Sequence, residues 1–181
     1  MDRFLIFHGW GGSDYPHWQS WLAGELAKNY GTVSFPLIHS PHHPNRKKWM
    51  SQFKKHLKEF KPTTVICHSL ACTVWFALCE EEEIDEVERL LLVSPPGLNT
   101  DIELLKTFFP SHLPKKLFAK EAKVVVSTND PYLTLEEAHN MQKRLGVDML
   151  ILENAGHINE KSGYGEWPWV LEWAKRDSET I

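Results

Sequence analysis

The chain lacks several features that would assign it to common functional classes. It contains no run of about 18 apolar residues, the length needed for a membrane-spanning helix. It begins with no basic stretch and no apolar region typical of a secretory signal, so we expect a cytoplasmic protein without membrane contact. Acidic residues outnumber basic ones by 24 to 20, and the net charge of −4 argues against nucleic acid as a partner.

Cysteine is also scarce, at three residues in 181, and the number is odd. Cys72 and Cys79 lie on one expected helix, about 10 Å apart along its axis, which is too far for a disulfide. We therefore expect reduced cysteines in the core, in keeping with a cytoplasmic location.

Short apolar segments alternate with helical sequence along the whole chain. The expected strands cover residues 3–7, 31–35, 63–67, 89–94, 123–128 and 149–152. The expected helices cover residues 17–29, 46–60, 70–82, 133–145 and 166–175. This alternation predicts one α/β domain over residues 1–181, in which a six-stranded parallel sheet carries helices on both faces as a three-layer α/β/α sandwich.

The third expected strand ends at a serine and continues directly into a helix. Ser69 follows Cys67 and His68, and Leu70 and Ala71 come next. This layout is typical of a nucleophile elbow, in which small residues two positions before and after the serine let a strained turn pass close to its neighbours. The usual glycines are replaced by Cys67 and Ala71, so an ordinary strand-to-helix junction with Ser69 as the N-cap is the alternative.

Two later residues strengthen the catalytic interpretation. Asp130 follows a β-branched strand, and His157 lies in a glycine-containing loop after the next strand. The chain order Ser69, Asp130, His157 is the order of an α/β-hydrolase triad. Ser69 needs a base to take its proton, His157 supplies one, and Asp130 would hold the imidazole in the required tautomer. Each site alone is also compatible with a plain turn or loop.

A glycine-rich loop follows the first expected strand. An oxyanion hole needs two backbone N–H donors, and we expect them from Leu70 and from Trp10 in this loop. Phosphate binding is the alternative, but the loop has no lysine and matches neither common phosphate-binding pattern.

Two further segments leave alternatives open. His39, His42 and His43 form a cluster that could bind metal, line the substrate entrance or be a plain loop; because no defined ligand set is present, we expect no metal and no cofactor. Residues 95–120 form a long connection whose apolar side chains either pack in the core or roof an acyl pocket. These side chains are Leu104, Leu105, Phe108, Phe109 and Leu113.

Several of these segments together resemble one family, the small serine hydrolases of the retinoblastoma-binding protein 9 / YdeN family. The resemblance rests on His8-Gly9-Trp10, residues 13–18, His68-Ser69-Leu70, Asn129-Asp130-Pro131 and residues 156–168. It implies a compact α/β-hydrolase with strand order 2-1-3-4-5-6 and a triad of Ser69, Asp130 and His157. The chain departs from the family at Cys67 and Ala71, where glycine is common. It also lacks an L-x-C-x-E segment for binding a pocket protein, since the run from Leu70 ends in valine at position 74.

The sequence therefore predicts a serine hydrolase, acting on a carboxylic ester or related acyl compound through an acyl-enzyme. A peptidase or amidase with the same triad, and a protein-interaction module with little turnover, are the alternatives. The expected partner is a small acyl or peptide substrate, and we expect a monomer.

Overall fold

The computed structural model describes residues 2–29, 31–82 and 84–175. The described residues form one six-stranded sheet in which every neighbouring pair of strands is parallel, in the order β2-β1-β3-β4-β5-β6. The strands are β1 (Arg3–Phe7), β2 (Thr32–Ser34), β3 (Thr64–His68), β4 (Val87–Val93), β5 (Ala119–Ser127) and β6 (Asp148–Leu152). The expected fold and strand order are confirmed.

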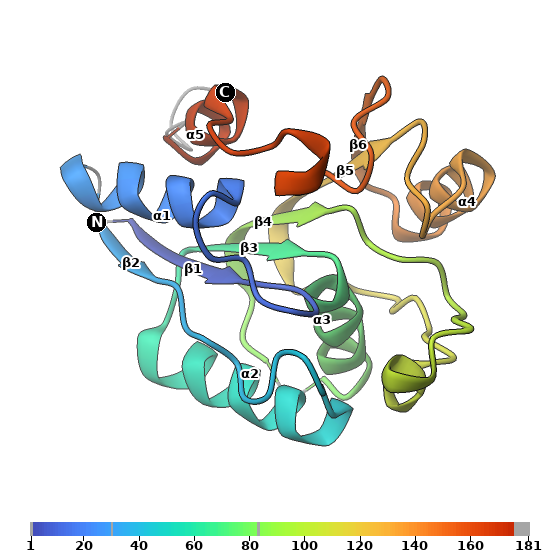
Figure 1. The fold of residues 1–181 in the computed structure, drawn as a ribbon. Coiled ribbons are helices and arrows are strands. Elements are labelled where there is room, and N and C mark those ends of the chain that lie inside the picture. Colours follow the sequence, from blue (N-terminus) through green and yellow to red (C-terminus); the bar gives the residue numbers. More distant parts are fainter. Residues whose placement is uncertain (1, 30, 83, 176–181) are drawn as a thin grey trace.

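Helices cover both faces of the sheet (Figure 1). They are α1 (Trp18–Asn29), α2 (Arg46–Phe60), α3 (Leu70–Glu80), α4 (Leu135–Leu145) and α5 (Pro168–Lys175). Successive strand residues point to opposite faces. Accordingly Leu5 and Phe7 of β1 pack with α2 and α3, whereas Phe4 and Ile6 pack with α1 and α5. The result is two apolar cores separated by the sheet.

Most element bounds lie close to those expected from the sequence, and β5 is the main exception. It begins at Ala119 and pairs there with Val87 of β4, four residues before the expected start. The added segment contains Lys120 and Glu121, whose polar character hides a strand from a search for apolar runs. Two short 3-10 helices, η1 (Glu103–Phe108) and η2 (Glu160–Ser162), were also not expected.

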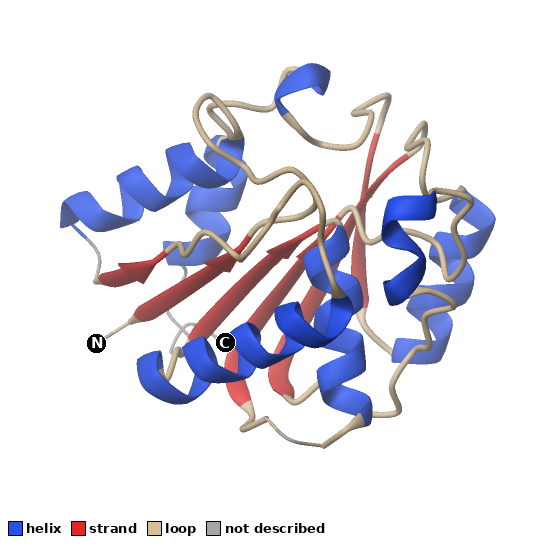
Figure 2. Ribbon diagram, turned by 60° about the horizontal axis from the view of Figure 1, so that its bottom comes forward, coloured by secondary structure: helices blue, strands red, loops and turns tan. Residues whose placement is uncertain are grey.

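All six strands run in the same direction, so their carboxyl ends meet at one edge of the sheet (Figure 2). In open α/β sheets this edge is where ligands bind. The loops after β1, β3, β4, β5 and β6 therefore converge on one region, which contains every residue singled out for catalysis.

Two smaller expectations concern the cysteines and membranes. Cys67, Cys72 and Cys79 are all free and buried, as expected for core residues. None of the helices formed by the described residues has both the length and the apolar character needed to cross a membrane.

Candidate active site

Ser69 occupies a strained turn between β3 and α3. Its φ of 55° and ψ of −122° place it in a region that non-glycine residues rarely adopt. Its side chain makes no capping hydrogen bond to α3, so the alternative of a simple N-cap is wrong. The Ser69 N–H instead donates to the carbonyl of Val93 at 2.9 Å, which ties the turn to the end of β4.

The three residues singled out as a triad lie in hydrogen-bond contact. His157 Nε2 lies 2.8 Å from Ser69 Oγ, and His157 Nδ1 lies 3.0 Å from both carboxylate oxygens of Asp130. Because a carboxylate can only accept, Nδ1 carries the ring proton and Nε2 is left free to accept from the serine hydroxyl. The Asp130 side chain is almost fully buried, and Oδ1 also accepts the N–H of Tyr132 at 2.9 Å.

The loop that carries His157 is held by short polar side chains at the end of β5. Ser127 Oγ accepts the N–H of Ala155 at 2.9 Å, and Thr128 Oγ1 accepts the N–H of Asn154 at 2.8 Å. The side-chain oxygen of Asn129 accepts the N–H of Gly156 at 2.7 Å. These contacts fix the loop after β6 against the residues just before Asp130. The Ser-Thr-Asn run before the aspartate was the available sequence signal, and sequence reasoning missed it.

Two buried side chains hold the carbonyl groups of the same loop. His68 Nε2 donates to the carbonyl of His157 at 3.0 Å, and Trp18 Nε1 donates to the carbonyl of Ile158 at 2.8 Å. The His68 ring also packs against the rings of His17 and His157, with centroids 4.9 and 5.2 Å away. His68 is thus a positioning contact for the loop of His157.

The glycine-rich loop after β1 lies directly against the elbow. A Cβ atom on Gly9 would come within 2.9 Å of Ser69 Cβ and 3.0 Å of the His68 carbonyl oxygen, so only glycine fits there. The His8 side chain holds this loop through two hydrogen bonds. Its Nε2 accepts the N–H of Ile38 at 2.9 Å, and its Nδ1 donates to the carbonyl of Gly9 at 2.7 Å.

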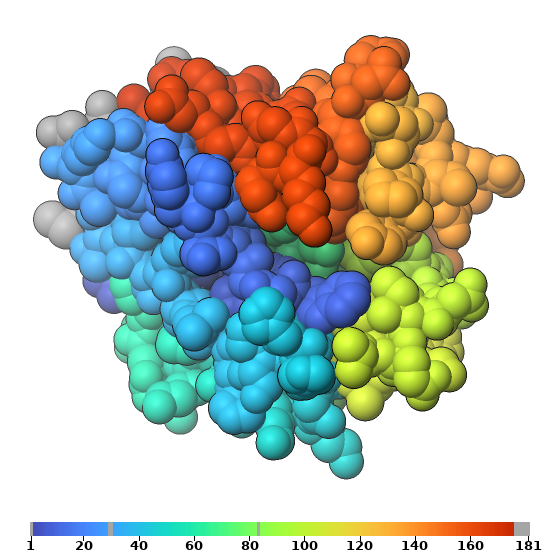
Figure 3. Space-filling model, in the orientation of Figure 1, coloured from blue at the N-terminus to red at the C-terminus, as the bar shows by residue number. Residues whose placement is uncertain are grey.

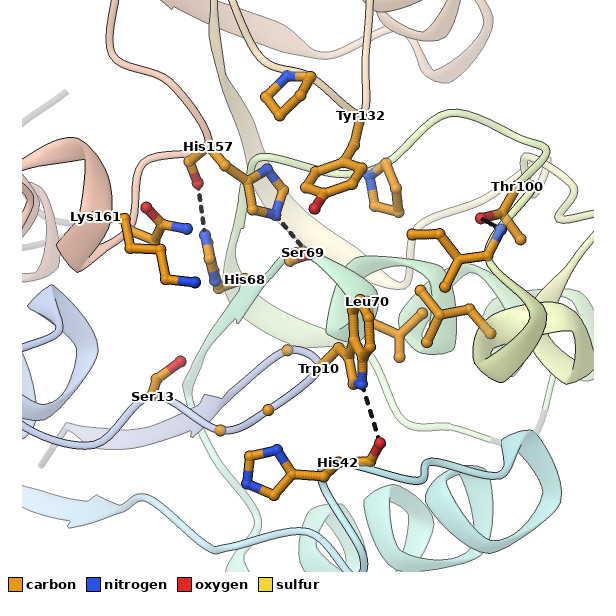
Figure 4. Close-up of a pocket in the computed structure, with 18 of the residues that line it drawn as sticks. Trp10, Ser13, His42, His68, Ser69, Leu70, Thr100, Tyr132, His157 and Lys161 are labelled. Atoms are coloured by element: carbon orange, nitrogen blue, oxygen red, sulfur yellow. Dashed lines mark hydrogen bonds between the residues drawn. The ribbon is translucent and has the colours of Figure 1, made fainter.

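A pocket of about 710 Å³ opens above Ser69. The space-filling view is hollowed between the N-terminal loop, the segment after β4 and the segment around residue 160 (Figure 3). The close-up shows Ser69 and His157 at its centre, with Trp10 below them (Figure 4). Trp10 is half-exposed, and its Nε1 donates to the carbonyl of His42 at 3.2 Å.

The histidine-rich segment after β2 and the connection after β4 both contribute residues to the pocket. Of the three clustered histidines, His42 lines the pocket, and the described residues include no group of three or more His, Cys, Asp or Glu placed to hold a metal ion. The connection after β4 serves both suggested roles. Phe108 packs in the core against Trp49, whereas Leu105 and Phe109 line the pocket.

Burial keeps the histidines around the pocket floor neutral. Burial lowers the pKa of His68 well below its ordinary value, and neighbouring His17 and His157 lower it further. Burial likewise lowers the pKa of His8. The pKa of His17 falls to about 4, through burial first and then through proximity to His157. His17 Nδ1 accepts the N–H of Gln19 at 3.1 Å at the start of α1, which also requires an unprotonated nitrogen.

His17 should make the folded state sensitive to acid. Since its pKa is about 4 when folded and 6.5 when unfolded, the unfolded chain binds the proton first, and stability falls as the pH drops from 6.5 towards 4. We expect His17 to account for roughly 2–3 kcal/mol of the unfolding free energy lost between pH 7 and pH 4.5. His17→Asn keeps a side-chain acceptor for the Gln19 N–H. The unfolding free energy of this variant, measured with urea at pH 7 and pH 4.5, should fall by that much less than the unfolding free energy of the parent.

The control for this measurement is His112→Asn at an exposed histidine, which should lose as much stability as the parent. An equally large loss in His17→Asn would show that His17 is not the titrating group.

Comparisons with known proteins agree with the fold. YdeN of Bacillus subtilis (strain 168) is 21% identical over 177 residues, covering 94% of this chain and 93% of that protein. Its crystal structure superposes with a TM-score of 0.84 at 19% identity over 96% of both chains. Est1E of Butyrivibrio proteoclasticus with bound ferulic acid gives a TM-score of 0.70 at 13% identity, over 97% of this chain and 87% of that one. The expected likeness to YdeN is confirmed, while that to retinoblastoma-binding protein 9 stays a prediction. A family model described as serine hydrolase matches residues 4–176, so the chain belongs to the serine hydrolase family.

Proposed function

We propose that the protein hydrolyses carboxylic esters through a Ser69-His157-Asp130 triad and an acyl-enzyme intermediate. The observation that carries this proposal is the continuous hydrogen-bonded chain from Ser69 Oγ through His157 to the buried Asp130 carboxylate, with contacts of 2.8 and 3.0 Å. It lies at the floor of a pocket large enough for a small ester. Membership of the serine hydrolase family supports the same chemistry.

In the first half of the reaction Ser69 Oγ attacks the ester carbonyl carbon. His157 Nε2 takes the hydroxyl proton as the new Oγ–C bond forms, and it returns that proton to the alcohol oxygen as the ester C–O bond breaks. Asp130 holds Nδ1–H and stabilises the imidazolium that forms between these steps. In the second half His157 Nε2 takes a proton from a water molecule as its oxygen attacks the acyl carbon. It returns that proton to Ser69 Oγ as the Oγ–C bond breaks, which releases the acid.

The negative oxygen of each tetrahedral intermediate needs two aligned donors. We assign these to the backbone N–H groups of Leu70 and Trp10. Neither group donates to any other described residue, so both are available to a ligand. The close packing of Gly9 on the elbow brings the two backbone segments together, since its Cβ position lies 3.4 Å from the Leu70 nitrogen.

The same geometry would also accept an amide or thioester, because the attacking and proton-transferring groups are the same. We favour esters over amides because an alcohol leaves the tetrahedral intermediate more readily than an amine. A substrate panel with matched ester, thioester and anilide decides among them. A protein-interaction module with little turnover predicts that none of the three reacts.

Ser69 should be the residue that a fluorophosphonate probe modifies. We expect stoichiometric labelling of the parent protein, because the hydroxyl is activated by His157. Labelling should disappear in Ser69→Ala and in a heat-denatured parent sample, measured by intact-protein mass spectrometry. Labelling that persists in Ser69→Ala would place the nucleophile at another residue.

Replacing Asp130 by asparagine should leave the fold intact but lower kcat by about 10⁴-fold, because the amide no longer selects the required tautomer of His157. The control is Asp148→Asn at the opposite end of β6, where the side chain is 85% exposed. That variant should keep kcat within about twofold, as expected for a surface position. A normal rate in Asp130→Asn would assign the acid to another carboxylate, such as Asp101 at the pocket edge.

Gly9→Ala should impair turnover through steric displacement of the loop that carries Trp10. The added methyl group would lie 2.9 Å from Ser69 Cβ, and a shift of about 1 Å at such a site costs about 10²-fold in rate. Gly24→Ala in α1 is the matched control, because no atom beyond its chain neighbours and the backbone of its own helix lies within 4 Å of the added Cβ. Equal kcat values for the two variants on p-nitrophenyl acetate would contradict the assigned oxyanion hole.

A further inference from the structure

The pocket around Ser69 has two chemically different sides. One side is lined by the apolar or aromatic residues Leu70, Pro96, Ile102, Leu105, Phe109 and Tyr132, together with Thr100 and its neighbours Asn99 and Asp101. The other is lined by polar groups, namely Ser13, Asp14, His17, His68, Asn159 and Lys161. Figure 4 shows Ser69 between them, with Thr100 and Tyr132 on one side and Ser13 and Lys161 on the other.

The apolar side is a packed wall built mainly by the connection after β4. The Gly97 N–H donates to the Tyr132 carbonyl at 2.8 Å, which joins this connection to the loop after β5. The Ser111 N–H donates to the Leu98 carbonyl at 2.8 Å, which closes the connection on itself. Leu105 is only 7% exposed, so its side chain forms the floor of this side rather than its rim.

The polar side is unsuited to an alkyl chain. An alkyl chain bound there would cover the Asp14, Asn159 and Lys161 side chains of the lining and deprive them of water without giving them a partner. A substrate group with its own hydrogen-bonding atoms would satisfy them.

The two halves of an ester make different demands on the pocket. After the first chemical step the acyl group stays on Ser69, while the alcohol leaves and a water molecule must take its place beside His157 Nε2. Water fills polar cavities but leaves apolar ones dry. The polar side therefore suits the leaving group and the incoming water, and the apolar side suits the acyl chain.

On the basis of the proposed ester hydrolysis, we propose that the substrate joins an apolar acyl chain, bound against Ile102, Leu105 and Phe109, to a polar alcohol bound on the side of Ser13 and Lys161. Each methylene buried against the apolar side should raise kcat/KM by a factor of about four. The value of kcat/KM then rises with acyl length from acetate to hexanoate esters. Lengthening an alkyl chain in the alcohol does not raise kcat/KM in this way.

Two isomeric esters test the orientation on the unaltered protein. Ethyl hexanoate and hexyl acetate have the same atoms, but the six-carbon chain lies on the acyl side in the first and on the alcohol side in the second. We expect kcat/KM to be at least tenfold higher for ethyl hexanoate. Equal values, or a preference for hexyl acetate, would overturn the proposed orientation.

Two tryptophan variants test the position of the acyl chain. Ile102 is half-buried and lines the pocket, whereas the nearby Leu104 is 46% exposed and does not line it. Ile102→Trp should lower the hexanoate-to-acetate ratio of kcat/KM for p-nitrophenyl esters at least tenfold. Leu104→Trp should leave the ratio within twofold of the parent. Equal ratios in the two variants would overturn the assigned site.

Hydrolysis of p-nitrophenyl acetate serves as the reference in every arm, because its short acyl group does not need the apolar side. Suppose that hydrolysis of p-nitrophenyl acetate depends on Ser69 but that kcat/KM does not rise with acyl length. That result would refute the acyl site and leave the proposed function standing. No Ser69-dependent hydrolysis of any ester would refute the proposed function itself. The isomer comparison needs no variant, so the orientation is tested even if Ile102→Trp does not fold.

Discussion

The backbone conformation of Ser69 is the constraint on which the rest of the site depends. Holding a serine at a φ of 55° costs on the order of 1–3 kcal/mol. The surroundings offset that cost, because β3 is buried along its length and residues 70–79 of α3 are buried as well. Neither element can shift without opening the core. The strained turn is therefore fixed in space, and Gly9 must lack a side chain so that the neighbouring loop can approach it.

Much of the architecture could be predicted from the sequence, because its signals are local. Short apolar runs that alternate with helical segments predict six strands and five helices, and the parallel arrangement then brings Ser69, Asp130 and His157 to one edge. The chain order of the three residues added a constraint that each alone did not provide. By contrast, the strand order rested on family resemblance, since alternation alone does not say which strands are neighbours.

The contacts that orient the site could not be predicted, because their partners are distant in the sequence. His68 holds the carbonyl of a residue 89 positions away, and Asn129 holds the N–H of a residue 27 positions away. The early start of β5 was missed for a different reason. Its first residues include the charged Lys120 and Glu121 and form no apolar run, so only their pairing with β4 identifies them as a strand.

The buried histidines near Ser69 show how the proposed reaction transfers the serine proton to His157 and not to another ring. His8, His17 and His68 are buried, and burial lowers the pKa of each, so they stay neutral at pH 7. Of these rings and His157, only His157 is hydrogen-bonded to a carboxylate in the described part of the chain. A proton released by Ser69 thus meets one ring whose cationic form is stabilised, beside rings that resist charging. The neutral neighbours also add no fixed positive charge next to the imidazolium, so they do not oppose its formation when His157 takes the serine proton.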